Sequence, residues 1–272
     1  MKLFALAATT FLIGQSVDLE IGDRAAFRFR SPPLNACGVA SLDDLRGKPV
    51  VVVYWGRETW GADQYVGDVL AWQKQWGDDL AIVFVESQGA SELQVEAVVF
   101  GRGWTGNRAM WSTEPLVNTG LIGIPIFALL SNEGELLLKS VAGMAGMGLL
   151  PRKMEAYEDA IARQVELRRK GPEGCPPSVA KAYKLFSKGD VAKALELAAA
   201  LAESPTGKEP EKERQAAEVA AMEFRFRLEQ RLTRAEWLFE HGYLVELREE
   251  LGALDEELES QSGLKERLAK VA

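Results

Sequence analysis

The sequence predicts an α/β half followed by an all-helical half, and three observations support this prediction. Residues 50–55 form an unbroken apolar run, VVVVYW, which is typical of a strand buried on both faces. A second apolar run follows at residues 80–85, after a segment whose apolar side chains recur at helical spacing. Beyond Ser178 the composition shifts to Ala, Leu, Glu, Lys and Arg with no strand pattern, which predicts a region of helices.

Composition limits the classes of function. The chain has 272 residues of which 47% are hydrophobic, enough to bury the cores of one or two domains. Its net charge of -8 argues against a nucleic-acid partner, which would require clustered Lys and Arg. The single histidine, His241, rules out metal sites built from several imidazoles, and its place at a predicted helix end favours a structural role. We expect no metal and no other cofactor.

The amino terminus resembles an export signal. A lysine at position 2, mostly apolar residues at 3–13 and small residues at 14–16 predict a signal peptide over residues 1–16. The apolar run is too short to cross a bilayer, so we expect no membrane span after cleavage and an exported protein, either periplasmic or extracellular. The alternatives are a buried first strand and a cytoplasmic protein.

The first half reads as a βαβ unit followed by further elements. After the strand at 50–55, Thr59 is a good helix N-cap, and a helix should run to Gly77 before the second strand at 80–85. The crossover between the two parallel strands should be right-handed. Ser91 and Gln94 form a capping box that opens another helix, which should end near residue 101.

Residues 101–120 are rich in Gly, Trp, Asn and Thr and predict an irregular loop. Trp104 and Trp111 in this loop could anchor a ligand or cover the core, the latter being the commoner use of tryptophan. The segment at 123–138, GIPIFALLSNEGELLL, then predicts a two-stranded hairpin with its turn at residues 132–134. Residues 149–169 should form the last helix of this half.

Four segments together resemble the thioredoxin-like superfamily, in its redoxin branch. They are residues 19–27 (LEIGDRAAF), 41–49 (SLDDLRGKP), 48–62 (KPVVVVYWGRETWGA) and 123–138. The resemblance covers residues 19–165 and implies a thioredoxin-like sheet flanked by helices over residues 17–170. It also implies that Pro125 follows a cis peptide bond and faces the first turn of the helix near Thr59.

Thr59 and Ala62 occupy the two positions at which redox-active relatives carry the Cys-x-x-Cys pair. Disulfide exchange requires a stabilised thiolate and a resolving thiol, and no cysteine occurs between Gly38 and Gly174. The resemblance therefore implies the fold without its redox chemistry. We expect a protein-binding or peptide-binding module, or a scaffold, whose binding surface lies around Thr59, Trp60, Trp104 and Pro125.

The two cysteines leave three alternatives open. Cys37 and Cys175 could form a disulfide that ties the linker to the first half, Cys37 could be an inert buried thiol, or it could be a lone reactive thiol. The third case supports an alternative function, a thiol-disulfide oxidoreductase or peroxidase that acts through Cys37 alone.

The helical half begins after a linker at residues 171–177, GPEGCPP, and extends over residues 178–272. Residues 182–190 and 235–243 align as a weak internal repeat, and each copy resembles a tetratricopeptide-like hairpin of two helices joined at a glycine. A long helix is expected at residues 211–240. Such hairpins could form a partner-binding surface, in which case this half carries the function, or simply pack on the first half. The acidic residues of segment 246–259 should form a solvated face.

Overall fold

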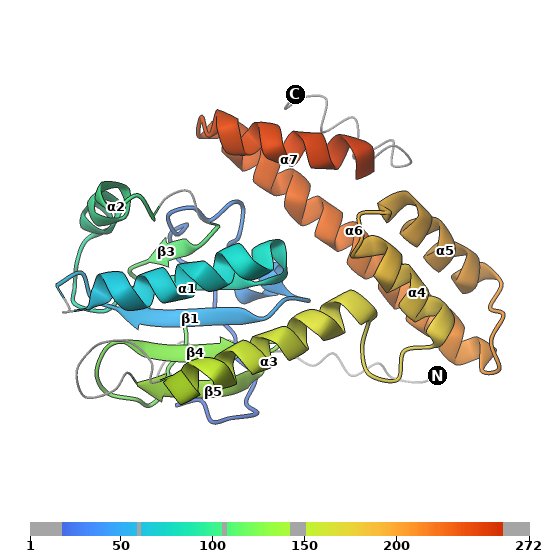
Figure 1. The fold of residues 1–272 in the computed structure, drawn as a ribbon, viewed down its shortest axis with the longest axis horizontal. Helices are drawn as coiled ribbons and strands as arrows, with labels where there is room; N and C mark the ends of the chain where they lie inside the picture. Colours follow the sequence, from blue (N-terminus) through green and yellow to red (C-terminus); the bar gives the residue numbers. More distant parts are fainter. Residues whose placement is uncertain (1–17, 59–60, 105–107, 142–150, 258–272) are drawn as a thin grey trace, which may run out of the picture.

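The computed structural model describes residues 18–58, 61–104, 108–141 and 151–257. The first half contains a five-stranded sheet, and the second half contains only helices (Figure 1). The elements of the first half are η1 (Leu42–Leu45), β1 (Val50–Trp55), α1 (Ala62–Trp76), η2 (Gly77–Asp79), β2 (Ala81–Glu86), α2 (Glu92–Gly101), β3 (Met110–Ser112), β4 (Ile126–Leu130), β5 (Leu136–Val141) and α3 (Pro151–Lys170). Those of the second half are α4 (Pro177–Phe186), α5 (Val191–Glu203), α6 (Pro210–Glu240) and α7 (Leu244–Glu257).

Strand β1 lies at the centre of the sheet, whose strand order is β3-β2-β1-β4-β5. β1 pairs in parallel with β2 and antiparallel with β4, and β3 pairs in parallel with β2. All six residues of β1 and all six of β2 are buried, because both faces of the sheet are covered. This arrangement and the packed helices confirm the predicted fold class, a thioredoxin-like α/β half followed by a helical region.

The two faces of the sheet are covered by different kinds of structure. On one face, side chains of α1, α2 and α3 pack against Val51, Val53 and Trp55, and Figure 1 shows α1 and α3 lying along this face. The other face, which includes Val50 and Val52, is covered by residues from segment 19–45 and from the loop before β4. Alternate residues of β1 therefore support two separate apolar cores.

Most elements of the first half confirm the sequence predictions. Ser91 and Gln94 form the predicted capping box of α2, with Ser91 N donating to Gln94 Oε1 at 3.0 Å. The hairpin of β4 and β5 closes as expected, with Gly134 N donating to Ser131 O at 3.0 Å.

Two local predictions were wrong. The N-cap of α1 is Gly61 and not Thr59, because the chain turns at Gly61 with a φ of 79°, a conformation that glycine adopts without strain. The segment expected to be wholly irregular contains strand β3, which has three residues and therefore no readable periodicity.

The helical half consists of two hairpins that close in the same way. Asp190 N donates to Leu185 O at 3.0 Å in the turn between α4 and α5, and Tyr243 N donates to Leu238 O at 2.9 Å between α6 and α7. The glycine before each donor has a positive φ, 86° and 76° respectively. The internal repeat therefore corresponds to a repeated turn. α4 and α5 pack against the first part of α6, and α7 packs against its last part (Figure 1).

None of the helices in the described part of the chain combines the length and the apolar content needed to cross a bilayer. The predicted signal peptide at residues 1–16 lies outside the described residues.

The two halves are joined by polar contacts around the end of α3. The helical half has its own apolar core, which contains no residue of the sheet. Arg168, near the end of α3, donates from Nε to Asp79 Oδ1 at 2.9 Å and from Nη1 to Gly47 O at 2.5 Å. Arg227 of α6 donates from Nη2 to the backbone carbonyl of Arg168 at 3.1 Å. The side chain of Arg168 thus ties α3 to the segments that precede β1 and β2, and its backbone carbonyl accepts the bond from helix α6.

Replacing Arg168 with alanine should destabilise the protein by about 3 kcal/mol, because it leaves the half-buried Asp79 carboxylate without its buried partner. Urea unfolding measures this loss. The matched control is Arg169→Ala: Arg169 contacts the same Asp79, but its side chain is 51% exposed, so the loss should stay below about 1 kcal/mol. Equal losses for the two variants would contradict this account of the Arg168–Asp79 ion pair.

Candidate functional site

The predicted peptide-facing surface lies at the carboxyl end of β1. The register pairs Tyr54 with Ile126, which places Pro125 beside the end of β1. The Ile124-Pro125 bond is cis, which confirms that expectation. Ile122, three residues before Pro125, is 94% exposed, so the loop that leads into β4 presents an apolar side chain to solvent.

The structure describes only some of the predicted site residues. Pro125 is buried, whereas Thr59 and Trp60 lie outside the described residues. Ala62, the second of the two positions that carry cysteine in redox-active relatives, is the first residue of α1 and is buried.

Trp104 lies in an aromatic cluster of the core. Its ring stacks on that of Trp111 with a centroid distance of 5.3 Å, and both rings meet Trp55 edge to face. Trp104 is only 8% exposed. Of the two uses expected for these tryptophans, the geometry matches covering the core.

The two cysteines are free thiols, so the predicted alternative of a disulfide between them is not realised in the structure. Cys37 lies against α6, where Arg234 Nη1 donates to its sulfur at 2.8 Å. Cys175 lies in the linker between α3 and α4, and its sulfur is 3.7 Å from the carbonyl oxygen of Pro176. Each sulfur therefore has its own separate environment.

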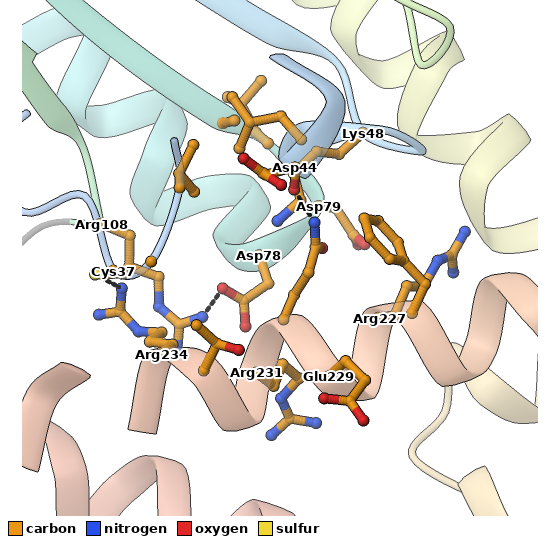
Figure 2. A pocket seen from close by; sticks show the side chains of 18 of the residues that line it. Cys37, Asp44, Lys48, Asp78, Asp79, Arg108, Arg227, Glu229, Arg231 and Arg234 are labelled. Atoms are coloured by element: carbon orange, nitrogen blue, oxygen red, sulfur yellow. Dashed lines mark hydrogen bonds and ion pairs between the residues drawn. The ribbon is translucent and has the colours of Figure 1, made fainter. Parts of the chain in front are cut away.

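A cavity of about 360 Å³ separates the first half from α6. It lies at the end of the sheet where β1 and β2 begin, opposite the end that carries Pro125. Figure 2 shows side chains that line it. The loop that contains Cys37 forms one wall and approaches α6 closely: a Cβ at Gly38 would lie 2.2 Å from Thr233 Cγ2. Glycine is required here both for this contact and for its φ of 85°.

Of the 25 residues that line the cavity, 11 are charged, and among these cations outnumber anions. The lining cations are Lys48, Arg108, Arg168, Arg169, Arg227, Arg231 and Arg234; the lining carboxylates are Asp44, Asp78, Asp79 and Glu229. This excess contrasts with the net charge of -8 of the whole chain.

Several of these cations are neutralised in place. Arg108 forms ion pairs with Asp78 and with Glu250, at 3.0 Å for the latter, and Arg231 pairs with Glu250 at 2.9 Å. Glu250 is 4% exposed, so it is not part of the solvated acidic face that the sequence predicted for it. Its carboxylate is buried because arginines from both halves of the protein surround it.

Lys48 differs from these arginines because, within the described part of the chain, its ammonium has no hydrogen-bond or ion-pair partner. It stands just before Pro49 and β1 and is half-buried. Desolvation, together with the nearby charges of Arg168 and Arg108, lowers the pKa of Lys48 to about 7. A substantial fraction of this lysine is therefore neutral near physiological pH.

Cys37 is a poor thiolate despite its cationic neighbours. Burial raises the pKa of its thiol, and this effect outweighs the opposing influence of Arg234 and Arg108. Its backbone has a φ of 50°, which is uncommon for a residue other than glycine. The surroundings of Cys37 thus favour the neutral thiol.

His241 has the structural position that the sequence favoured. It is the C-cap of α6, its ring stacks on Trp237 at a centroid distance of 4.1 Å, and its Nδ1 lies 2.8 Å from the Trp237 carbonyl oxygen. Within the described residues, no group of three His, Cys, Asp or Glu side chains is arranged to hold a metal ion.

Sequence reasoning missed the cavity. Arg227, Arg231 and Arg234 recur at intervals of four and three residues, so they share one face of α6. This basic face can be recognised in the sequence. That it lines a cavity cannot, because the cavity also needs Cys37 and Lys48, which lie far away in the chain.

The replacement Lys48→Met should change how stability depends on pH. Because the pKa of Lys48 is about 7 in the folded protein and ordinarily 10.5, the unfolded chain binds more protons between these values, and wild-type stability should rise with pH across this window. The variant has no lysine to titrate at this position and so avoids the cost of holding a charged Lys48 in the folded protein. It should therefore be more stable than wild type below about pH 7, and the difference in stability should shrink towards about pH 10.

Thermal unfolding at several pH values measures this difference. The exposed Lys181→Met variant is the control and should follow the wild-type profile. A Lys48→Met profile parallel to that of wild type would contradict the assigned shift.

Comparisons with known proteins add a structural likeness only. No protein-family model and no curated protein matches the chain. Among solved structures, a candidate thiol:disulfide interchange protein DsbE from Chlorobium tepidum is 22% identical, with a TM-score of 0.39, over 54% of this chain and 99% of its own. The exposed lipoprotein thioredoxin Etrx1 of Streptococcus pneumoniae is 19% identical, with a TM-score of 0.38, over 53% of this chain and 98% of its own.

These identities are too low to transfer an activity, and the fold assignment rests on strand order, strand direction and helix placement in this chain. The molecule combines a thioredoxin-like α/β half, without cysteines at positions 59 and 62, with a helical half.

Proposed function

We propose that this protein is a redox-inactive thioredoxin-like module that binds an extended peptide or a partner protein outside the cytoplasm. The observation that carries the proposal is the combination found at the carboxyl end of β1. The loop before Pro125 is present with an exposed apolar side chain, Ile122, whereas no cysteine occurs between Gly38 and Gly174.

Redox chemistry has no support at this end of the sheet. A threonine hydroxyl at position 59 does not ionise at neutral pH and cannot form a disulfide, and Ala62 offers no resolving thiol. Binding does not require these groups. In redox-active relatives the proline equivalent to Pro125 helps to hold an extended substrate, and the resemblance carries this role to the present chain.

The apolar loop suits peptide recognition. Ile122 lies in the run Leu121-Ile122-Gly123-Ile124, and burying an exposed isoleucine side chain contributes about 1.5–3 kcal/mol. The export part of the proposal rests on the signal-like residues 1–16. Trp60 and Trp104 belong to the proposed surroundings of this surface, with Trp104 supporting it from the core.

The second candidate is an enzyme that acts through Cys37. The contact from Arg234 to its sulfur favours this candidate, since a cation stabilises a thiolate. The raised pKa of the thiol counts against it, as does the absence of a second cysteine among the residues that line the same cavity. We therefore rank the binding module first.

Wild-type protein should not accelerate the reduction of insulin by dithiothreitol, and Cys37→Ser should leave this baseline unchanged. The double variant Thr59→Cys/Ala62→Cys should gain measurable turnover, because it restores a thiol pair at the start of α1. A wild-type activity that Cys37→Ser abolishes would overturn the proposal in favour of the second candidate.

Peptide binding can be tested with a random peptide library displayed on phage, followed by fluorescence anisotropy of a selected peptide. Ile122→Asp should weaken binding at least about tenfold, because it places a charge in an apolar contact. Val245→Asp is the matched control, since Val245 is also a highly exposed apolar residue but lies on α7. Selected peptides whose affinity is insensitive to Ile122→Asp would place the binding surface elsewhere.

A further inference from the structure

The cavity between the two halves carries positive charge at two separate ends. Figure 2 shows Cys37, Arg108 and Arg234 on one side, and Lys48 and Arg227 on the other. We propose that this cavity binds a small, elongated organic dianion of the dicarboxylate type, with one carboxylate at each end. This inference is independent of the proposed peptide site, which lies at the opposite end of the sheet.

At the first end, Arg234 is the cation that a ligand can use. Its Nη1 donates to Cys37, and its Nε has no hydrogen-bond partner and lies 3.9 Å from the nearest oxygen of Glu250. Glu250 is already shared with Arg108 and Arg231. The arginines outnumber the carboxylate, so an anion that enters here meets donors with spare capacity.

At the second end, Lys48 has no hydrogen-bond or ion-pair partner among the described residues. Arg168 is satisfied by Asp79 and Gly47, and Arg227 donates from Nη2 to Glu223 and to the Arg168 carbonyl. The Nε of Arg227, which is 5% exposed, has no partner. A buried guanidinium nitrogen and a half-buried ammonium, both unpaired and both lining one cavity, are what a carboxylate would satisfy.

The space between the two ends suits a short carbon chain. Apolar side chains that line the cavity include Leu45, Leu80, Met110 and Phe226. Three of the four lining carboxylates oppose an anion only weakly, because Asp78 is paired with Arg108, Asp79 with Arg168 and Arg169, and Asp44 accepts the N–H groups of Ala40 and Ser41; the fourth is Glu229. The volume of about 360 Å³ falls at the lower end of the range for small-molecule sites.

Binding should also take up a proton. Lys48 is surrounded by Arg168, Arg108 and Arg227, with Asp79 as the opposing charge. A bound carboxylate would favour the ammonium form of Lys48, so affinity should fall as pH rises through about 7 and above. Aliphatic dicarboxylates remain ionised over this range, so a change in affinity would come from titration of the protein and not of the ligand.

Isothermal titration calorimetry of the full chain with succinate, glutarate and adipate tests the proposal, with butyrate as a monoanion of similar size. At least one dicarboxylate should bind, and at least about tenfold more tightly than butyrate. Lys48→Met and Arg234→Gln should each weaken binding at least about tenfold, whereas Arg248→Gln, on the exposed surface of α7, should not. Raising the pH from about 6 to about 9 should weaken binding to wild type but not to Lys48→Met.

Three outcomes would overturn the proposal: no heat of binding with any dicarboxylate at millimolar concentration, equal affinity for butyrate, or binding that both cavity variants leave unchanged. Lys48→Met keeps the test independent of folding, because this variant should be at least as stable as wild type below about pH 7. Phosphoglycolate is titrated in the same way, and its binding in the absence of any dicarboxylate binding is the form of the first outcome that would assign the cavity to phosphorylated acids.

Discussion

The polar contacts between the first half and helices α6 and α7 are the interactions on which the architecture depends, among them the bond from Arg227 to the backbone carbonyl of Arg168 and the ion pair of Arg108 with Glu250. The apolar cores of the two halves share no residues, so the hydrophobic effect stabilises each half but does not by itself fix one against the other. At the junction Arg227 of α6 donates to the backbone carbonyl of Arg168, whose buried side chain is held within the first half by Asp79 and by the carbonyl of Gly47. Desolvation lowers the pKa of Arg168 to about 10, yet the guanidinium stays charged at neutral pH and keeps its partners.

This junction also separates two possible sites along one sheet. The carboxyl end of β1 retains the apolar loop before Pro125 but not the thiols that would make it catalytic. The opposite end, where β1 and β2 begin, receives the basic face of α6. Because α6 contacts the first half through polar side chains, a cavity remains between them, and its charges are only partly neutralised. In the proposed dianion site the helical half contributes side chains to binding as well as to packing.

Sequence reasoning recovered what depends on local pattern. The apolar runs in β1 and β2, the capping box of α2 and the glycine turns of the two helical hairpins each have a short-range cause, and each was found in the structure. The start of α1 was misplaced because Gly61 turns the chain after the residue that looked like a cap. Strand β3 was missed because three residues carry no period.

The cavity could not be predicted because its members are brought together only by tertiary structure. Arg234 and Cys37 are 197 positions apart, and Lys48 becomes unusual only when arginines from α3 and from the loop before β3 surround it. Glu250 shows the same limit: within an acidic run it looks solvated, whereas the fold buries it among arginines. A charge pattern alone does not indicate which charges will be desolvated.

The most direct test of the account is whether the two halves unfold together. In a Trp237→Phe variant the remaining six of the seven tryptophans all precede Arg168, so fluorescence would report the first half, whereas circular dichroism at the helix band reports largely on the helical half. If the charged junction couples the two cores, the two probes should give the same midpoint in urea. Two separated transitions would contradict the claim that the polar contacts between the first half and helices α6 and α7 make one cooperative molecule of the two halves.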